Sequence, residues 1–443
     1  MSVRSAALHT LTVREAAAAM ATGSVTPRAV ADAALARIAA TDPLVHAWAH
    51  LDRDRVQRLA DAAAQAPAAP LRGIGIGVKD IIDTADLPTE IGSPLHEGRR
   101  PARDAACVQR LHDAGAYVFG KTVTTAFAFV DPGATCNPWR PQHTPGGSSS
   151  GSAAAVAAAQ VAAAIGTQTN GSVIRPAAYC GVVGFKPTVG LIDFGGAHVF
   201  SGTFDTLGTF TRTVDDAALV ASALAPAGRL ASVPTALTRA PHVAFLAAFP
   251  WTSIEADAAD ALSAAAVRLR NAGAIVTPVG FPDAWRDAHR VHRSIMLYEG
   301  AQALGPLQAQ HRTRLSAQTN AALDEGHAIA EADYRAALAA RAQAVAYFTD
   351  WLAPYDAIVA PPSSGAAPAT LMSTGDPGCC TLWSLVGFPA IALPIGRNAQ
   401  NLPLGLQLAT VRGRDDELLC AASWCEAQLG YARAIAPLAG SAA

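Results

Sequence analysis

Residues 145–155, P-G-G-S-S-S-G-S-A-A-A, place three consecutive serines among glycines and directly before an alanine-rich run. Glycine gives the backbone access to conformations that other residues avoid, whereas alanine favours a helix. Three kinds of feature have this composition: a flexible linker, an anion-binding loop and a catalytic serine site. A helical run follows at once, which counts against the linker, and the rest of the chain has to decide between the other two.

Composition limits the partners that the chain can have. Half of the 443 residues are hydrophobic and 15% are charged, which supports a large buried core. The net charge of -2 argues against nucleic acid and against an anionic membrane surface. The longest apolar run, residues 153–165, is too short to span a bilayer, and residues 1–10 lack the apolar segment of a secretory signal. We therefore expect a cytoplasmic protein that binds neither nucleic acid nor membrane.

Two residue types, cysteine and lysine, bear on the chemistry. The seven cysteines form no C-x-x-C pair and the chain has no H-E-x-x-H motif, so we expect reduced, mostly buried thiols and no metal site. Lysine is rare, because only Lys79, Lys121 and Lys186 stand among the 33 basic residues. Lysine can lose its proton where arginine cannot, so the use of lysine at each of these positions calls for a reason, which for Lys186 we expect to be structural.

Helix and strand signals alternate along the chain. Residues 12–15, T-V-R-E, form a capping box, and Thr26-Pro27 places an N-cap before a proline at the first helical position. The alanine-rich run and residues 253–271 and 331–352 are typical of helices. Short apolar runs typical of buried strands lie at 73–83, 116–122, 181–188, 241–247, 273–279, 355–362, 390–395 and 404–409. This alternation predicts an α/β fold with helices on both faces of the sheet.

A nucleotide-binding loop is one alternative. Residues 115–122, G-A-Y-V-F-G-K-T, match G-x-x-x-x-G-K-T. In such a loop the middle residues curve around phosphate, after a strand and before a helix. Here they include Tyr117, Val118 and Phe119, which favour a buried strand, and the helix comes first. We therefore expect residues 115–122 to contain a strand that ends near Lys121, and not a nucleotide site.

A nucleophile elbow is the second alternative. Residues 147–151, G-S-S-S-G, match G-x-S-x-G and would make Ser149 a nucleophile, with His143 or His198 as its base. Such an elbow follows a strand directly, but residues 137–145 contain three prolines and cannot form a central strand. No pattern singles out either histidine, so this interpretation is also weak.

The third interpretation joins the serine loop to a second glycine-containing segment. Residues 166–176, G-T-Q-T-N-G-S-V-I-R-P, place Ser172 behind Asn170-Gly171, where the backbone can turn several N–H groups toward one point. A serine needs a base to act as a nucleophile. Lys79 ends an apolar strand, where burial would lower its pKa and let it act as that base.

Several motifs in this order resemble the amidase signature family, over about residues 12–430. They are 77–80 (G-V-K-D), 145–155, 166–176, 184–190 (G-F-K-P-T-V-G), 386–396 and 402–415, and the order S-V-I-R is similar to the malonamidase-like branch. The resemblance implies an α/β fold with a large mixed β-sheet flanked by α-helices on both faces, in a single domain of residues 1–443. That domain would comprise N-terminal helices at 12–70, the signature core at 71–215, and the remaining sheet with the substrate pocket at 216–443.

The family uses a serine–cis-serine–lysine triad, which the motifs transfer to this chain. Lys79 is then the base, Ser148 the bridging serine behind a cis peptide bond, and Ser172 the nucleophile. Ser149 and Ser150 would support the loop through hydrogen bonds or capping. The resemblance also implies an oxyanion hole formed by the backbone N–H groups of Thr169, Asn170, Gly171 and Ser172.

The implied activity is hydrolysis of the C–N bond of a carboxylic amide through an acyl-enzyme, without metal or cofactor. In the malonamidase-like branch, the arginine at the position of Arg175 holds the carboxylate of a small substrate. The other interpretation is an internal ion pair, for example with Asp205. Two alternatives within the family are an amidotransferase subunit that supplies ammonia to a partner and a non-catalytic homologue. The sequence also leaves open a homodimer and both the acyl and the amine specificity.

Two positions depart from the commoner family pattern. Gln168 stands where aspartate is frequent, and Asn170 stands where glycine is frequent. Asparagine tolerates a left-handed backbone, so we still expect the oxyanion hole to form. Residues 120–128 lack the Asn and Glu often found after G-K-T, and residues 285–380 are expected to shape the acyl pocket.

Overall fold

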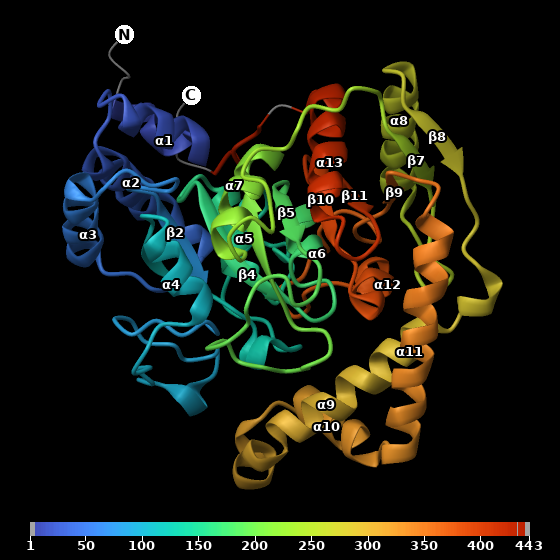
Figure 1. Ribbon diagram of the computed structural model, residues 1–443. Helices are drawn as coiled ribbons and strands as arrows, with labels where there is room; N and C mark the ends of the chain where they lie inside the picture. The colour runs from blue at the N-terminus through green and yellow to red at the C-terminus, as the bar shows by residue number, and fades with distance from the viewer. Residues whose placement is uncertain (1–4, 432, 439–443) are drawn as a thin grey trace.

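In the computed structural model, which describes residues 5–431 and 433–438, eleven strands form one mixed sheet (Figure 1). Their order across the sheet is β1-β3-β2-β4-β6-β5-β10-β11-β9-β7-β8. The strands are β1 (Trp48–His50), β2 (Gly75–Lys79), β3 (Tyr117–Thr122), β4 (Ala163–Gln168), β5 (Val183–Lys186), β6 (Thr206–Thr211), β7 (His242–Phe245), β8 (Ile275–Pro278), β9 (Ala357–Ala360), β10 (Ala390–Arg397) and β11 (Pro403–Ala409). The predicted α/β fold with a large mixed sheet is confirmed.

The sheet contains two groups of parallel strands, separated by antiparallel ones, and the edge strand β1 pairs with β3 in antiparallel fashion. β2 is parallel to β3 and to β4, and β7 is parallel to β8 and to β9. Between these two groups, β4, β6, β5, β10, β11 and β9 pair in antiparallel fashion. Parallel neighbours end at the same edge of a sheet, so the carboxyl ends of β2 and β4 meet, which places Lys79 beside the segment that follows β4.

Helices cover both faces of the sheet, because successive strand residues point to opposite sides. In β10, for example, Ile391 and Leu393 join one core, whereas Ala390 and Ala392 join the other. The first core is covered by α1 (Val13–Ala21), α4 (Ala106–Asp113), α7 (Val214–Leu224), α8 (Ala256–Asn271) and α13 (Asp415–Leu429). The second core is covered by α2 (Pro27–Val45), α3 (Arg53–Gln65), α5 (Ser150–Ala157), α6 (Ile174–Cys180) and α12 (Gly378–Val386).

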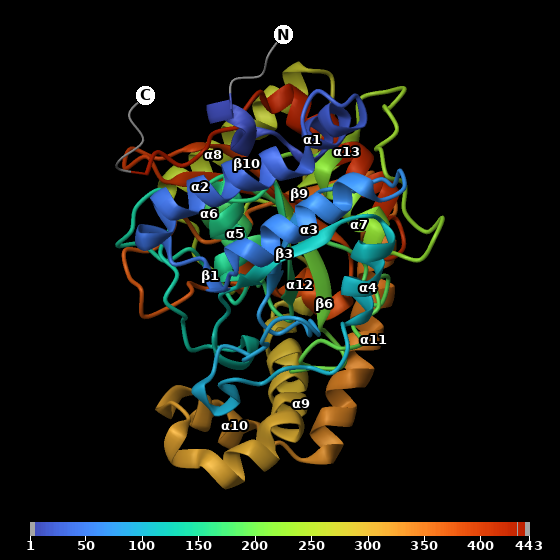
Figure 2. The same cartoon turned by 90° about the vertical axis from the view of Figure 1, so that its left-hand side faces the viewer.

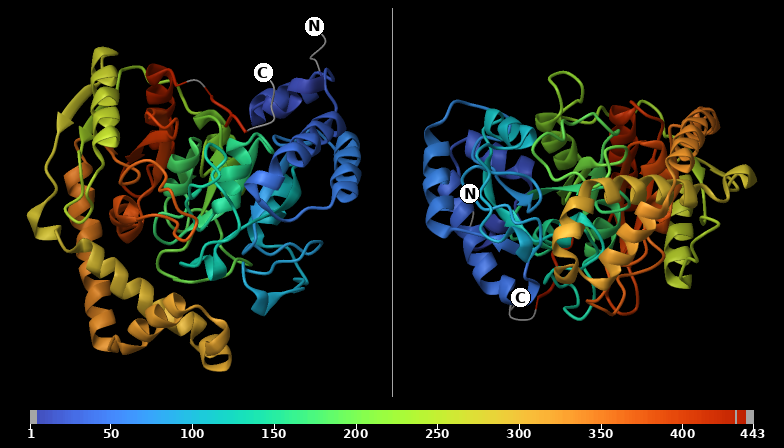
Figure 3. Two further views of the ribbon diagram at one scale, coloured as in Figure 1. Left: turned by 180° about the vertical axis from the view of Figure 1, so that it is seen from behind. Right: turned by 90° about the horizontal axis from the view of Figure 1, so that it is seen from below.

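Three further helices extend away from the sheet as a helical arm (Figures 1–3). They are α9 (Ala288–His311), α10 (Ala317–Ala328) and α11 (Glu331–Leu352), and α11 leads back to β9. α10 packs tightly on α9, because a Cβ at Gly326 would lie 2.2 Å from the carbonyl oxygen of Leu297. The arm supplies one wall of the cavity described below.

Most of the local predictions agree with the structure. The Thr12 capping box and the Thr26 cap are both present, and the strand predicted within residues 115–122 is β3. The helix predicted at 331–352 matches α11, whereas α8 begins at Ala256 and not at 253. No helix among the described residues is long and apolar enough to cross a bilayer.

The alanine-rich run at 153–165 differs from the prediction. It does not form one helix, because α5 ends at Ala157 and Ala159 takes a left-handed backbone with φ of 54°. The chain then enters β4, a central strand that continues to Gln168. β6, with the sequence T-L-G-T-F-T, was not predicted either. Residues 1–4, 432 and 439–443 lie outside the described residues. The two ends of the predicted domain 1–443 therefore lie outside them, as does the start of residues 1–10, the segment expected to lack a secretory signal.

Candidate active site

Three segments far apart in the sequence bring Lys79, Ser148 and Thr167 together. Lys79 is the last residue of β2, Ser148 precedes α5, and Thr167 lies near the end of β4. The Lys79 Nζ donates hydrogen bonds of 2.7 Å to the Ser148 Oγ and 2.7 Å to the Thr167 Oγ1. The side chain of Lys79 is completely buried, so these two hydroxyls are its immediate polar surroundings.

Burial also sets the charge of Lys79. Removal of the ammonium from water lowers the pKa of Lys79 to about 7, and the nearby Asp205 carboxylate opposes this effect only in part. A substantial fraction of the amine is therefore neutral at neutral pH. A neutral amine beside a serine hydroxyl can accept a proton, which a lysine in water at this pH cannot do.

The serine loop is fixed by hydrogen bonds to the sheet. The Gly147–Ser148 peptide bond is cis, as the resemblance implied. The Ser149 Oγ donates to the Thr167 carbonyl oxygen at 3.1 Å and accepts from the Thr167 N–H at 3.2 Å, and Ser150 donates to the Val123 carbonyl oxygen. The predicted supporting role of Ser149 and Ser150 is thus confirmed as hydrogen bonding. α5 begins at Ser150, with no side-chain hydrogen bond from the N-cap Ser149.

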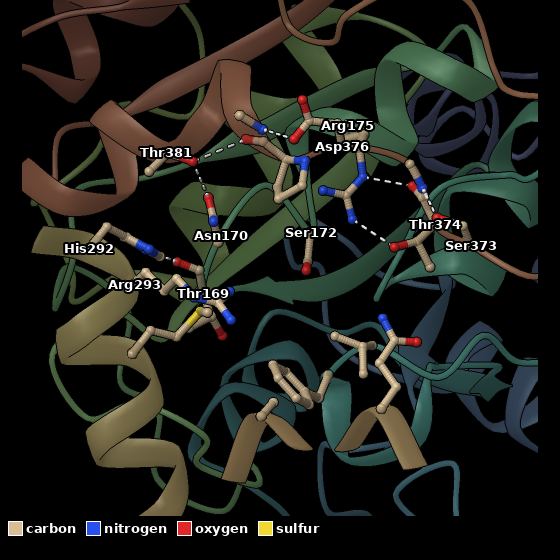
Figure 4. Close-up of a pocket in the computed structure, with 18 of the residues that line it drawn as sticks. Thr169, Asn170, Ser172, Arg175, His292, Arg293, Ser373, Thr374, Asp376 and Thr381 are labelled. Atoms are coloured by element: carbon tan, nitrogen blue, oxygen red, sulfur yellow. Dashed lines mark hydrogen bonds between the residues drawn. The ribbon is translucent and has the colours of Figure 1, made fainter. Parts of the chain in front are cut away.

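Ser172 lies in the turn between β4 and α6. Its hydroxyl points into the pocket of Figure 4, between Asn170 and Arg175. The backbone N–H groups of Asn170, Gly171 and Ser172 donate no hydrogen bond to any of the described residues. These adjacent donors are available to a ligand, and the oxyanion hole implied by the resemblance stays a prediction.

Gln168 and Gly171 hold this turn in shape. The Gln168 Oε1 accepts from the N–H groups of Val173 (2.8 Å) and Ile174 (3.0 Å), so glutamine caps the start of α6. The left-handed residue is Gly171, with φ of 83°, and Asn170 is not left-handed, so the expected use of asparagine in that conformation is wrong. Asn170 instead accepts a hydrogen bond of 3.0 Å from the Thr381 Oγ1.

Arg175 connects two loops beside the turn. Its Nε donates to the Thr374 carbonyl oxygen (2.8 Å), and its Nη2 donates to the Gly147 carbonyl oxygen (2.8 Å) and to the Thr374 Oγ1 (3.0 Å). Its Nη1 is buried without a partner. The alternative of an ion pair with Asp205 is wrong, because Asp205 accepts from the Thr169 hydroxyl and from the backbone at Phe200 and Ser201.

A cavity of about 670 Å³ opens over Ser172. Its walls come from the turn before α6, from the loop at 128–130, from α9 and α10 of the helical arm, and from residues 372–378. Residues from the range 285–380 line the cavity, and their expected role in shaping an acyl pocket stays a prediction. His143 and His198 do not line this cavity, and residues 137–145 form no strand before the buried Ser149, so the nucleophile elbow is excluded.

Comparison with known proteins identifies the family. A model of the Amidase family matches residues 29–419. The chain belongs to the Amidase family. One subunit of the glutamyl-tRNA(Gln) amidotransferase of Chloroflexus aurantiacus is 34% identical over 90% of this chain and 93% of that protein. A solved structure described as an amidase has a TM-score of 0.87 at 30% identity and covers 95% of this chain and 100% of its own. The peptide amidase of Stenotrophomonas maltophilia has a TM-score of 0.81 at 31% identity and covers 96% and 98%.

As a member of the Amidase family, the protein is an enzyme that cleaves amide C–N bonds. The malonamidase-like branch stays a prediction. Among the described residues, no three His, Cys, Asp or Glu side chains are grouped so that they could hold a metal ion. The seven cysteines are free thiols, and most of them are buried.

The sequence did not reveal the contacts of several residues that surround the candidate site. Thr167 was quoted within a motif but given no role, and Thr374 lies about two hundred positions from Arg175. Asp205 is buried beside Thr169, and burial raises its pKa to about 6. His292 is fully buried against the Thr169 carbonyl oxygen, which is 3.2 Å from its Nε2, and burial lowers its pKa to about 4. None of these positions has a sequence signal, because their partners are set by tertiary contacts.

Proposed function

We propose that the protein is a serine amidase that hydrolyses a carboxylic amide through an acyl-enzyme on Ser172. The observation that carries this proposal is the buried Lys79 amine, which lies 2.7 Å from the Ser148 Oγ and has a pKa of about 7. A base of this pKa works near neutral pH, where it is both deprotonated and able to accept a proton. The free N–H groups at Asn170, Gly171 and Ser172 give further support.

The reaction begins when the neutral Lys79 amine takes the proton of the Ser148 hydroxyl, while Ser148 takes the proton of Ser172. The Ser172 Oγ forms a bond to the amide carbonyl carbon, and the carbonyl oxygen gains negative charge. The N–H groups of the turn at 169–172 hold that oxyanion. Lys79 then returns its proton through Ser148 to the amide nitrogen, the C–N bond breaks, and the amine leaves. Water attacks the ester by the same relay and releases the acid.

In this proposal Arg175 positions the bridging serine, because its Nη2 holds the Gly147 carbonyl oxygen next to Ser148. Only the Nη1 remains for an oxygen of the substrate. A bidentate grip on a carboxylate uses two guanidinium nitrogens, and two of the three nitrogens are already bound to the protein. The predicted binding of a substrate carboxylate by Arg175 is therefore tested by comparing an acidic amide with a neutral one.

An amidotransferase component is the second candidate, because one subunit of the glutamyl-tRNA(Gln) amidotransferase of Chloroflexus aurantiacus is 34% identical over 90% of this chain. In that case the chain would deliver ammonia to a partner and would hydrolyse amides slowly alone. Purification of the tagged chain from its native cell, followed by identification of co-purifying subunits, separates the two candidates.

Ammonia release by the purified chain tests the proposal. Malonamate and a neutral amide of similar size are compared for wild type, Ser172→Ala and a matched control, Ser222→Ala. Ser222 lies on α7, and its hydroxyl donates only to the Leu219 carbonyl oxygen. We expect turnover that Ser172→Ala abolishes and Ser222→Ala retains. Equal activity of the two variants would overturn the assignment of Ser172.

A further inference from the structure

Five apolar residues line part of the cavity over Ser172, and we call them the apolar wall: Phe129, Phe200, Met296, Ala321 and Ala322. Polar residues of α9 and α10 also line the cavity, namely Arg293, Gln318 and Glu325. The rings of Phe129 and Phe200 are stacked, with centroids 4.5 Å apart and an angle of 20° between their planes. Met296 comes from α9, and the two alanines come from α10. None of the side chains of the apolar wall offers a hydrogen bond to a polar ligand.

The fold holds this wall in place from two directions. On α9, Gly300 lets Phe200 pack against the helix backbone, since a Cβ there would lie 2.5 Å from the ring. In the loop before Phe129, Phe127 and Ala128 both have left-handed backbones, with φ of 55° and 58°. Two consecutive non-glycine residues in this region are uncommon, and such conformations persist where the surroundings impose them, often at ligand sites.

The same loop is tied to the triad. Thr125 donates through its N–H to the Ser148 carbonyl oxygen (3.2 Å) and through its Oγ1 to the Phe129 carbonyl oxygen (3.0 Å). The apolar wall is therefore positioned relative to the bridging serine, and a substrate group that rests on it is held in register with the amide at Ser172.

The size of the cavity also favours a ligand with a large apolar group. Its volume of about 670 Å³ lies within the roughly 300–1,000 Å³ that encloses drug-sized ligands. An amide of two or three carbons would leave most of this space, including the apolar wall, filled with water. A larger apolar substituent would displace that water and bury apolar surface, which is favourable in proportion to area.

We propose that the substrate is an amide that carries an aryl or medium-length alkyl group, and that this group binds to the apolar wall. The inference rests on the proposed function and specifies its substrate class. The apolar group can belong to the acyl part or to the leaving amine. Two series of substrates separate these cases: primary amides from acetamide to octanamide with phenylacetamide, and acetamides with N-alkyl or N-aryl groups.

The test is the dependence of kcat/KM on chain length. Burial of one methylene contributes about 0.8 kcal/mol, so we expect kcat/KM to rise by about fourfold for each methylene until the wall is covered. The series that shows this rise identifies which part of the substrate is apolar. Two flat series would overturn the inference while the hydrolytic function stands, and a preference for malonamate over hexanamide would exclude the acyl part as the apolar group.

A matched pair of variants locates the effect. Ala322→Phe places a ring in the cavity, whereas Ala339→Phe places one on the exposed side of α11, away from the cavity. We expect Ala322→Phe to reduce the hexanamide to acetamide ratio of kcat/KM at least tenfold, and Ala339→Phe to leave the ratio unchanged. An unchanged ratio in Ala322→Phe would contradict the location of the wall.

A measurement of binding without turnover distinguishes a failure of this inference from a failure of the proposed function. Calorimetry on Ser172→Ala measures the Kd of the same amides without turnover. If wild type hydrolyses none of them, the proposed function fails, and the inference is decided by affinity alone. Affinity that increases with chain length and decreases in Ser172→Ala combined with Ala322→Phe supports the wall, and affinity independent of chain length overturns it.

Discussion

Replacement of Thr167 by valine tests how the base is controlled. The Thr167 Oγ1 is one of the two hydrogen-bond partners of the Lys79 Nζ, at 2.7 Å, and valine has nearly the same shape without the hydroxyl. The charged ammonium loses more from the missing acceptor than the neutral amine does. The pKa of Lys79 should therefore move further down from its value of about 7.

The size of the shift follows from the hydrogen bond. A hydrogen bond to a charged group contributes about 1.5–3 kcal/mol, and one pKa unit corresponds to about 1.4 kcal/mol. The acid limb of the kcat/KM profile should move down by about one to two pH units. The plateau should fall as well, because the base is weaker and less firmly oriented, but by less than the roughly 10²–10⁴-fold that general base catalysis contributes.

The assay is kcat/KM against pH from 4 to 9, with thermal unfolding to check the fold. Thr167→Ser keeps the hydroxyl and should restore the acid limb of wild type. The matched control is Thr209→Val in the neighbouring β6, since the buried Thr209 hydroxyl has no partner among the described residues. An acid limb in folded Thr167→Val that coincides with that of wild type would refute the role of Thr167 in setting the base.

Four further predictions concern the lysines and Arg175. Lys121→Met should lower the free energy of unfolding, measured in urea, by about 3–5 kcal/mol. In the wild type the Lys121 Nζ lies 3.2 Å from the buried Asp80 carboxylate, and the variant leaves that carboxylate without a cation. A smaller loss of stability than in Lys186→Met would contradict this. Lys186→Met should lower the free energy of unfolding only slightly at pH 7. Burial lowers the pKa of Lys186 to about 7, and among the described residues its Nζ donates one hydrogen bond, to the Pro187 carbonyl oxygen. A variant that does not fold would count against this. Burial lowers the pKa of Lys79 and Lys186 to about 7 and that of Lys121 to about 8, so the free energy of unfolding should rise between pH 7 and 10.5, because the unfolded chain then holds protons that the folded chain has released; urea unfolding of Lys79→Met and of Lys186→Met should each show a weaker rise. Arg175→Lys should lower kcat/KM for a neutral amide by about ten- to a hundredfold, since one ammonium cannot replace a guanidinium that binds two loops; full activity on the neutral amide would show that the loops do not depend on it.

Local signals in the sequence predicted the parts of the fold that local physics determines. The Thr12 capping box and the Thr26 cap are satisfied within one helical turn, so their residues alone specify them. The alanine-rich run was mistaken for one helix, because alanine fits a helix and a crowded central strand alike, and the boundary at Ala159 depends on packing.

The residues of the candidate site likewise include some that motifs in the sequence indicate and others that only the fold brings together. The motifs singled out Lys79, Ser148 and Ser172, and the strand order then brings β2 beside β4, with Lys79 within hydrogen-bond distance of Ser148. Thr374 is different, because it meets Arg175 only through the folded position of a loop in the second half of the chain. The apolar wall combines residues from four segments of the chain, and no spacing in the sequence links Phe129 to Met296.

Covalent labelling of Ser172 as a function of pH tests the central claim most directly. A sulfonyl fluoride is reacted with the protein between pH 5 and 9, and the modified residue and the rate are determined by peptide mass spectrometry. We predict modification at Ser172, with a rate that rises through about pH 7 as Lys79 loses its proton and that is lost in Lys79→Met. Modification at another serine, or a Ser172 rate that Lys79→Met leaves unchanged, would contradict the account.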